Sequence, residues 1–491
     1  MAASIIGERF QRICRDRATT VAVQVISSST TATFSDLAAE CTAIECALTA
    51  LGVGHGATVV SFVGNRPIFF SLVVACMEAG AALVPLGEAT DAEAASLIEQ
   101  AGAVAVITDR DLPIRVVREH SFSSGVRLLR LADREDPPEY GRSVVLKLTS
   151  GSTHLPKAAV AAETHLVNDG RHIIEAMGIE PTDVNFTCIP LSHSYAIGNV
   201  VMPLLWQGTP VALRQSFNPA HLVRDVADSG ATVFPGVPFM FERIKSFEPI
   251  DQLPVSLRLL ITAGARIDAD TVSWFRRHLD RKVHSFYGSS ETGGIAYDDS
   301  EDVSDPLHVG RAMPETTIAI RQSEPGAAAG RVFVEGNAVA SGYAHAEGDP
   351  ISAFSDGGFI TGDLGYLDGT GRLVLTGRVS LLVNVAGRKV DPAEVERRLL
   401  EVPGIADARV LGMSCDTRGQ QVVAFVVRTD ATLTPLAIRQ RCAETLSTHK
   451  IPRRFVFVDR FPVDARGKID QRALQRLVSS ADPDGVATGT L

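Results

Sequence analysis

The sequence lacks several features by which classes of protein are recognised. Its seven cysteines are scattered, and none forms the C-x-x-C pair of a zinc or thiol redox site. The most apolar window, residues 68–86, contains Glu78 and Pro85, which favours a buried helix followed by a strand over a membrane span. The N-terminal segment has no apolar core or cleavage site of a signal peptide. We therefore expect a cytoplasmic protein without a membrane span.

Acidic residues outnumber basic ones. The 47 Lys and Arg residues are outnumbered by 57 Asp and Glu residues, giving a net charge of −10, which argues against a general nucleic-acid binder. An anionic ligand is not excluded, because a local cluster of backbone N–H groups holds a phosphate whatever the overall charge. A chain of 491 residues is too long for a single ordinary hydrophobic core, so we expect at least two domains.

Two familiar nucleotide-binding motifs are missing. Residues 52–57, GVGHGA, match G-x-G-x-x-A, but they follow a predicted helix and precede a predicted strand. A dinucleotide fingerprint requires the reverse order, so we interpret this segment as a helix stop and a turn. The segment KLTSGSTHLPKAAV, residues 147–160, is not a Walker A loop, which needs Gly-Lys-Ser/Thr at the start of a helix.

Helical and strand-like patterns alternate over residues 34–213 and return before residue 316, which predicts an α/β domain with mostly parallel strands. Strand-rich segments with glycine turns follow and predict a small β-rich subdomain. The remaining sequence alternates helix and strand in a compact α+β pattern. We predict a large N-terminal domain over 1–379, a small mobile C-terminal domain over 380–478 and a disordered tail over 479–491.

The segment after the predicted strand VVLKL is rich in hydroxyl groups. Its Gly151 allows the backbone to bend close to a ligand, and Lys157 adds a positive charge. Consecutive N–H groups in such a turn form a site for an anion. The residues alone leave two interpretations open, a phosphate-binding loop and a Ser/Thr-rich surface loop. The hydroxyl residues are Thr149, Ser150, Ser152 and Thr153.

A series of motifs, in order, resembles the adenylate-forming superfamily of acyl-CoA synthetases, adenylation domains and luciferases. TSGSTHLPKAA is similar to the phosphate loop of that family, IPLSHSYAIGN to its histidine segment, and YGSSETGG to its Y-G-x-[ST]-E motif. TGDLGYLDGTGRLVLTGRVS, NVAGRKVDPAEVE and PVDARGKIDQRAL resemble its later motifs. The resemblance runs from about Arg9 to Leu474.

The resemblance implies a two-step reaction. A carboxylate attacks the α-phosphate of ATP, which gives an acyl-adenylate and pyrophosphate, and a thiol then displaces AMP. The implied cofactors are ATP, Mg²⁺ and CoA. The implied catalytic residues are Lys468, Glu291, His193 and Lys157. In this family the lysine corresponding to Lys468 neutralises charge between the carboxylate and the α-phosphate.

The same resemblance assigns the nucleotide site. Asp363 would accept the ribose hydroxyls, Arg378 would support the ribose or phosphates, and Tyr287 would lie against the adenine. Glu291 and Thr153 would hold Mg²⁺ through oxygen atoms. The full set of expected ATP and AMP contacts is Thr149, Ser150, Gly151, Ser152, Thr153, Gly264, Ala265, Arg266, Tyr287, Gly288, Ser290, Asp363 and Arg378.

The expected acyl pocket carries no obvious aspartate to fix an amino group, which favours an aryl or aliphatic acid over an amino acid. His193 would gate this pocket, and the alternative for it is a buried structural histidine. The resemblance places the hinge between domains at Ser380 and the thiol tunnel at Gly387. The expected pocket residues are His193, Asn199, Phe239, Gly264 and Gly288.

Two alternatives to a CoA ligase stay open at this point. One is an enzyme that loads the phosphopantetheine thiol of a carrier protein, and the other is a non-catalytic homologue that binds nucleotide or acyl-adenylate. The sequence fits a monomer or a homodimer. It departs from the family at His154 and Ala158, where glycine is usual, and at Ser380, where Asp or Lys is common. Glycine permits positive φ and close approach to phosphate, so His154 raises the question of how well the loop binds ATP.

Overall fold

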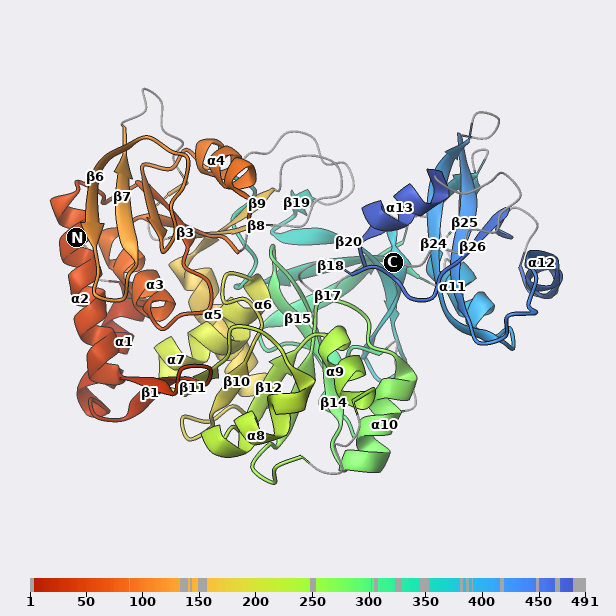
Figure 1. Cartoon of the computed structure of the whole chain (residues 1–491), viewed down its shortest axis with the longest axis horizontal. Coiled ribbons are helices and arrows are strands. Elements are labelled where there is room, and N and C mark those ends of the chain that lie inside the picture. The colour runs from red at the N-terminus through yellow and green to blue at the C-terminus, as the bar shows by residue number, and fades with distance from the viewer. Residues whose placement is uncertain are drawn as a thin grey trace. The chain divides into compact units, whose positions relative to one another are not determined.

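Figure 1 shows a computed structural model of the whole chain. The structure describes residues 4–87, 89–132, 140–141, 144–148, 157–247, 253–301, 303, 308–322, 329–344, 353–379, 383–385, 388–390, 392–415, 419–446, 450–463 and 469–479. The chain divides into two compact units, one made of residues 1–318, 334–359 and 371–373 and the other of residues 319–333, 360–370 and 374–491. Among the described residues, no helix has the length and apolar character needed to cross a membrane.

One large sheet of the first unit has seven strands in the order β6-β7-β5-β3-β4-β8-β9. β5, β3, β4 and β8 run parallel, and β9 returns antiparallel to β8. Helices α2 (Phe34–Ala50) and α3 (Ile68–Ala79) cover one face, and α4 (Asp91–Gln100) covers the other. The strands are β3 (Thr58–Phe62), β4 (Ala82–Pro85), β5 (Ala105–Thr108), β6 (Val116–Ser121), β7 (Arg127–Leu131), β8 (Val144–Leu148) and β9 (Ala158–Ala162).

The second large sheet of this unit has the order β16-β15-β14-β13-β12-β10-β11-β1-β2. The strands from β14 to β1 in that order run parallel, so their carboxyl ends lie along one edge. The strands are β1 (Val21–Val25), β2 (Thr30–Thr33), β10 (Asn185–Thr187), β11 (Val211–Leu213), β12 (Val233–Gly236), β13 (Leu259–Thr262), β14 (Val283–Ser289), β15 (Gly293–Tyr297) and β16 (Arg311–Ala312).

Both faces of this second sheet are buried. On one face, Phe234 of β12 packs with Phe241 of α9 (Pro238–Lys245) and Phe275 of α10 (Ala269–Leu279). On the other face, hydrophobic residues of β12 and β13 pack with α5 (Glu163–Met177). Burial on both faces explains the short, almost wholly apolar strands of the sequence.

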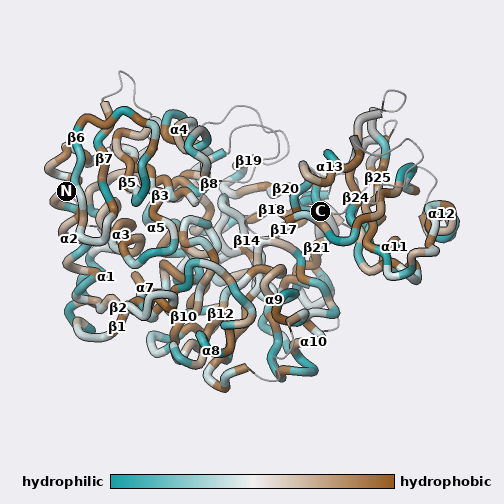
Figure 2. The backbone as a smooth tube through the Cα atoms, viewed as in Figure 1, coloured by the Kyte–Doolittle hydropathy of each residue, from teal (hydrophilic) through white to brown (hydrophobic). Residues whose placement is uncertain are grey.

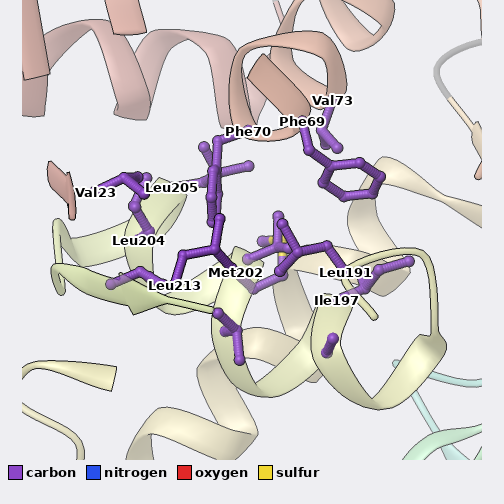
Figure 3. Close-up of a cluster of buried hydrophobic side chains, with 14 of the residues drawn as sticks. Val23, Phe69, Phe70, Val73, Leu191, Ile197, Met202, Leu204, Leu205 and Leu213 are labelled. Atoms are coloured by element: carbon purple, nitrogen blue, oxygen red, sulfur yellow. The ribbon is translucent and has the colours of Figure 1, made fainter. Parts of the chain in front are cut away.

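The segment after β10 is also anchored in the core. It forms α6 (Ser194–Ala196), the π-helix η1 (Ile197–Val201) and α7 (Met202–Gln207). Figure 3 shows Ile197, the first residue of the π-helix, and Met202, the first residue of α7, in one hydrophobic cluster with Phe69 and Phe70 of α3. The remaining helices of this unit are α1 (Ile5–Asp16) and α8 (Pro219–Ser229).

A five-stranded sheet follows in the chain, and the division between the two units passes through its strands. Its order is β17-β18-β20-β19, with β21 paired to β20. The strands are β17 (Thr316–Arg321), β18 (Gly330–Gly336), β19 (Ala353–Ser355), β20 (Gly358–Leu367) and β21 (Leu373–Arg378).

The rest of the second unit is a sheet with helices on both faces. Val422 and Ala424 of β25 point toward α11 and α12, whereas Val423 and Phe425 point toward α13, as the strand period of two requires. Figure 2 shows the hydrophobic colour of β25. The elements are β22 (Val383–Val385), β23 (Arg388–Val390), α11 (Pro392–Leu400), β24 (Ile405–Cys415), β25 (Gly419–Arg428), α12 (Pro435–Ala443), β26 (Arg454–Phe457) and α13 (Gln471–Ser479).

The predicted fold class is confirmed, with α/β layers, a small β-rich part and a small α+β part. The segment GVGHGA lies between the end of α2 at Ala50 and the start of β3 at Thr58, as the helix-stop interpretation predicts. The boundary between residues 379 and 380 stays a prediction. Residues 480–491 of the predicted tail lie outside the described residues.

Candidate functional site

Four of the predicted site segments follow four neighbouring parallel strands. His193 comes after β10, Phe239 after β12, Gly264 after β13 and Ser290 after β14. These strands are adjacent in the sheet, in the order β14-β13-β12-β10. Parallel α/β sheets bind ligands at the carboxyl ends of their strands. The topology thus brings segments that are far apart in the sequence to a common edge.

The turn after β14 depends on close backbone packing. Tyr287 pairs with Ala296 of β15 and Gly288 pairs with Gly294, with a register shift between the two pairs. A Cβ atom at Gly288 would lie 2.6 Å from the carbonyl oxygen of Gly293, so this position has no room for a side chain. Tyr287 is half-buried, next to strand β13.

Ser290 connects this turn to two other segments. Its Oγ lies 2.8 Å from Oγ of Ser194, at the start of α6. The Ser290 hydroxyl also lies 3.4 Å from the carbonyl oxygen of Leu148, the last residue of β8, to which it donates. Ser290 therefore links the histidine segment to the strand that enters the predicted phosphate loop.

Glu291, the predicted magnesium ligand, is almost buried, with 9% of its surface exposed. The hydroxyl of Tyr343 donates a hydrogen bond of 2.7 Å to its Oε1. The amine of Lys157 lies 5.2 Å from the centre of the Tyr343 ring, which is a cation–π distance. Tyr343 thus contacts both a predicted catalytic cation and a predicted metal ligand.

Main-chain pairing places Tyr343 at this position. The Val160 amide donates to the Gly342 carbonyl at 2.9 Å, and the Ala344 amide donates to the Ala158 carbonyl at 2.8 Å. Residues 342–344 therefore run antiparallel beside β9, with a single β-bridge between Ala159 and Tyr343. Tyr343 could not be predicted from the sequence, because nothing in the sequence near it indicates that this segment pairs with β9.

The predicted phosphate loop connects β8 and β9. These strands are antiparallel, with Leu148 opposite Ala158. Ala158 is 8% exposed and packs in the core of the sheet. Its place in a regular strand explains why a side chain is tolerated there instead of glycine. Outside the described residues lie Thr149, Ser150, Gly151, Ser152, Thr153 and His154.

The predicted acyl-pocket residues occupy different environments. His193 is half-buried at the residue before α6, and Phe239 is half-buried in α9, with Cζ of Arg243 5.8 Å from its ring. Asn199 is 1% exposed within the π-helix. The Nδ2 group of Asn185 donates to the Asn199 carbonyl at 3.3 Å. Single π-helical turns are frequent at functional sites.

The loop after β13 is open to solvent. Gly264, Ala265 and Arg266 are all exposed. Because β13 lies beside β14, the loop and Tyr287 come from neighbouring strands. This arrangement is compatible with the predicted contacts on either side of an adenine.

The two residues predicted to contact the ribose, Asp363 and Arg378, meet in the second unit. Nε of Arg378, at the end of β21, lies 2.6 Å from Oδ1 of Asp363 in β20. The Asp363 side chain is 15% exposed, and the Arg378 side chain is 58% exposed. The arginine therefore orients the carboxylate that the family resemblance assigns to the ribose.

The Glu291 carboxylate is the kind of ligand taken by a magnesium ion that is shared with phosphates. Among the described residues, no group of three His, Cys, Asp or Glu side chains could hold a metal ion by itself. Mg²⁺ typically takes one or two carboxylates together with water and substrate phosphates. Glu291 supplies one such carboxylate. The second predicted ligand, Thr153, lies outside the described residues, as do Lys468, Ser380 and Gly387.

Comparisons with known proteins identify the family of the chain. Residues 10–344 match the family model described as AMP-binding enzyme, and residues 394–468 match the AMP-binding enzyme C-terminal domain. The chain is 28% identical to the 2-succinylbenzoate–CoA ligase of Bacillus licheniformis, over 87% of this chain and 91% of that protein. It is 27% identical to a feruloyl-CoA synthase of Amycolatopsis sp., over 94% of this chain and 97% of that protein.

Solved structures resemble the whole chain. ATP-bound MatB from Rhodopseudomonas palustris has a TM-score of 0.83 and 22% identity, covering 98% of this chain and 99% of that one. The o-succinylbenzoate CoA synthetase of Bacillus subtilis, in complex with the acyl-adenylate intermediate OSB-AMP, has a TM-score of 0.78 and 23% identity, covering 96% and 98%. These likenesses establish the fold.

The contact between Tyr343 and Glu291 can be tested by Tyr343→Phe, which removes only the hydroxyl. Loss of a group that orients a metal ligand typically costs about 10- to 100-fold in metal affinity. We therefore expect the affinity for MgATP, measured by titration calorimetry, to fall roughly tenfold or more. Tyr366→Phe, at an exposed tyrosine of β20, is the control and leaves the affinity unchanged. Equal affinities of Tyr343→Phe and the wild type would contradict a role for this hydroxyl.

Proposed function

The chain belongs to the AMP-binding enzyme family, and from this premise we propose that it is an AMP-forming acid–CoA ligase. The carboxylate of the acid attacks the α-phosphorus of ATP, and the bond to pyrophosphate breaks. The thiol of CoA then attacks the acyl carbon, and AMP leaves. The observation that carries the proposal is the gathering of the predicted segments at the carboxyl ends of β10, β12, β13 and β14.

The phosphate-binding roles belong to the first unit. Lys157 approaches the phosphates with a positive charge, and its cation–π contact with Tyr343 restricts where the amine lies. Glu291, with the predicted ligand Thr153, would hold Mg²⁺. When bound, this ion neutralises phosphate charge. The resemblance of the motif alone assigns further phosphate contacts to residues 149–153.

Adenosine binding involves several further residues. Tyr287 and the loop of Gly264 and its neighbours contact the adenine, and Asp363, oriented by Arg378, accepts the ribose hydroxyls. Lys468 acts in adenylation through electrostatic stabilisation. The proposed C-terminal domain, residues 380–478, pivots at Ser380 and presents Gly387 to the thiol. The roles of Lys468, Ser380 and Gly387 rest on the resemblance of the motifs alone.

The proposed substrate is an aryl or aliphatic carboxylic acid. The expected pocket residues, among them Phe239 and the small Gly288, carry no carboxylate to fix an amino group. The relatives named for 2-succinylbenzoate and the feruloyl group favour aryl acids as the first to test. CoA is the proposed acceptor because those relatives are CoA ligases. The proposed location is the cytoplasm, and the proposed assembly is a monomer or homodimer.

A panel of aryl and aliphatic acids tests the proposed function. Purified protein with ATP, Mg²⁺ and CoA should release pyrophosphate with at least one acid and form its CoA thioester, detected by mass spectrometry. Accumulation of adenylate without a thioester would favour a carrier-protein thiol as the acceptor. ATP binding without pyrophosphate release across the whole panel would instead indicate a non-catalytic homologue.

Replacing Lys468 by alanine tests the adenylation step. Loss of one preorganised group that stabilises transition-state charge costs about 100-fold or more in rate, so pyrophosphate release should fall by at least that factor. Lys450→Ala is the control, because Lys450 also belongs to the second unit but pairs with Glu394 at 2.7 Å. Circular dichroism checks that both variants fold. Adenylation at the normal rate in Lys468→Ala would refute this role.

The variant His154→Gly tests the unusual phosphate loop. We expect the KM for ATP to change by less than about tenfold, because glycine frees the backbone at one position but adds no group that contacts phosphate. Ala158→Gly is the matched control. It should not lower the KM for ATP, since Ala158 lies in a regular strand and packs in the core. A larger improvement in His154→Gly would show that the histidine impairs ATP binding.

A further inference from the structure

A buried ion pair lies at the base of the predicted phosphate loop. Nζ of Lys147 is 3.6 Å from Oδ2 of Asp169, and these side chains are only 2% and 4% exposed. Lys147 belongs to β8, the strand that enters the loop, and Asp169 belongs to α5, the helix that directly follows β9. The pair therefore joins the two chain segments that flank the loop.

The other carboxylate oxygen of Asp169 holds a third segment. Oδ1 accepts a hydrogen bond of 2.8 Å from the amide of Gly294, just after the turn that carries Glu291. Gly293 has φ of +68°, and a Cβ atom there would lie 2.5 Å from Cγ of Asp169. A Cβ atom at Gly198, in the π-helix, would lie 3.1 Å from Oδ2 of the same carboxylate. Asp169 is thus in close contact with three elements of the candidate site.

The histidines near Asp169 do not replace Lys147 as its counter-ion. Burial lowers the pKa of His172, and burial together with the charge of Lys147 lowers the pKa of His165. Both imidazoles are therefore neutral at neutral pH. Nδ1 of His165 instead accepts the Ala162 amide at 3.1 Å, which fixes the start of α5.

The contacts of Asp169 have a mechanical consequence for the proposed reaction. A buried charge without its partner is strongly unfavourable, so Lys147 and Asp169 stay in contact. The same carboxylate restrains Gly294, and Ser290 donates to the carbonyl of Leu148, the neighbour of Lys147. Displacement of catalytic groups by about 1 Å can cost about 100-fold in rate.

We propose that Asp169 is a positioning residue that, through its ion pair with Lys147 and the hydrogen bond from Gly294, fixes the base of the phosphate loop against the turn carrying Glu291. This inference rests on the proposed function of the same site. Asp169 itself acts through these neighbours and does not touch the reacting atoms.

The experiment separates the ion pair from general stability. Asp169→Asn keeps an oxygen that accepts the Gly294 amide but leaves the Lys147 charge without a counter-charge. The double variant Lys147→Met/Asp169→Asn removes both charges. It should therefore recover much of the thermal stability that Asp169→Asn alone loses. Asp298→Asn is the matched control, because Lys282 and Asp298 form another buried pair in the same unit, at 2.7 Å.

We expect Asp169→Asn and Asp298→Asn both to lower the melting temperature, whereas only Asp169→Asn lowers kcat for pyrophosphate release by about tenfold or more and weakens MgATP binding in titration calorimetry. The double variant should melt closer to the wild type yet keep the low kcat. A double variant with wild-type kcat, or an equal loss of kcat in Asp298→Asn, would overturn the proposal.

The two hypotheses fail in distinguishable ways. MgATP binding is measured without any acid, so a wild type that binds ATP but is silent with every acid would contradict the ligase function alone. A wild type that is active, with Asp169→Asn equal to it in kcat and in MgATP affinity, would contradict the positioning role alone.

Discussion

The parallel pairing of β10, β12, β13 and β14 is the constraint on which the candidate site depends. Each strand ends at the same edge of the sheet, so residues separated by up to a hundred positions in sequence meet there. The buried faces of the sheet fix the register, because a slip of one residue would turn core side chains outward. Packing of the core therefore fixes the positions of the strand ends, and the candidate site residues lie at or just after those ends.

A second layer of contacts joins this edge to the neighbouring sheet. Ser290 reaches the end of β8, Tyr343 links Lys157 with Glu291, and Asp169 restrains both Lys147 and Gly294. These contacts join segments that a phosphate-binding reaction must keep in fixed relation. They also explain two glycines, since Gly288 and Gly293 lie where a Cβ atom would collide with backbone or with Asp169.

Sequence reasoning predicted the elements whose patterns are local. The helix and strand patterns, the strand VVLKL and the interpretation of GVGHGA all agree with the structure, because burial periodicity and turn residues are properties of short segments. Tyr343 and the pair of Lys147 and Asp169 were missed. Their significance arises from pairing between distant segments, which a single sequence does not reveal. Ala158 seemed unsuited to a phosphate loop, but it already belongs to a strand.

The central claim is that these strand ends form an adenylation site. Exchange of labelled pyrophosphate into ATP tests it most directly, since the reverse of adenylation requires bound acid, nucleotide and a competent phosphate loop, and needs no thiol. The account predicts exchange that depends on a carboxylic acid and on Mg²⁺. Absence of exchange with every aryl and aliphatic acid, in protein that binds MgATP, would contradict it.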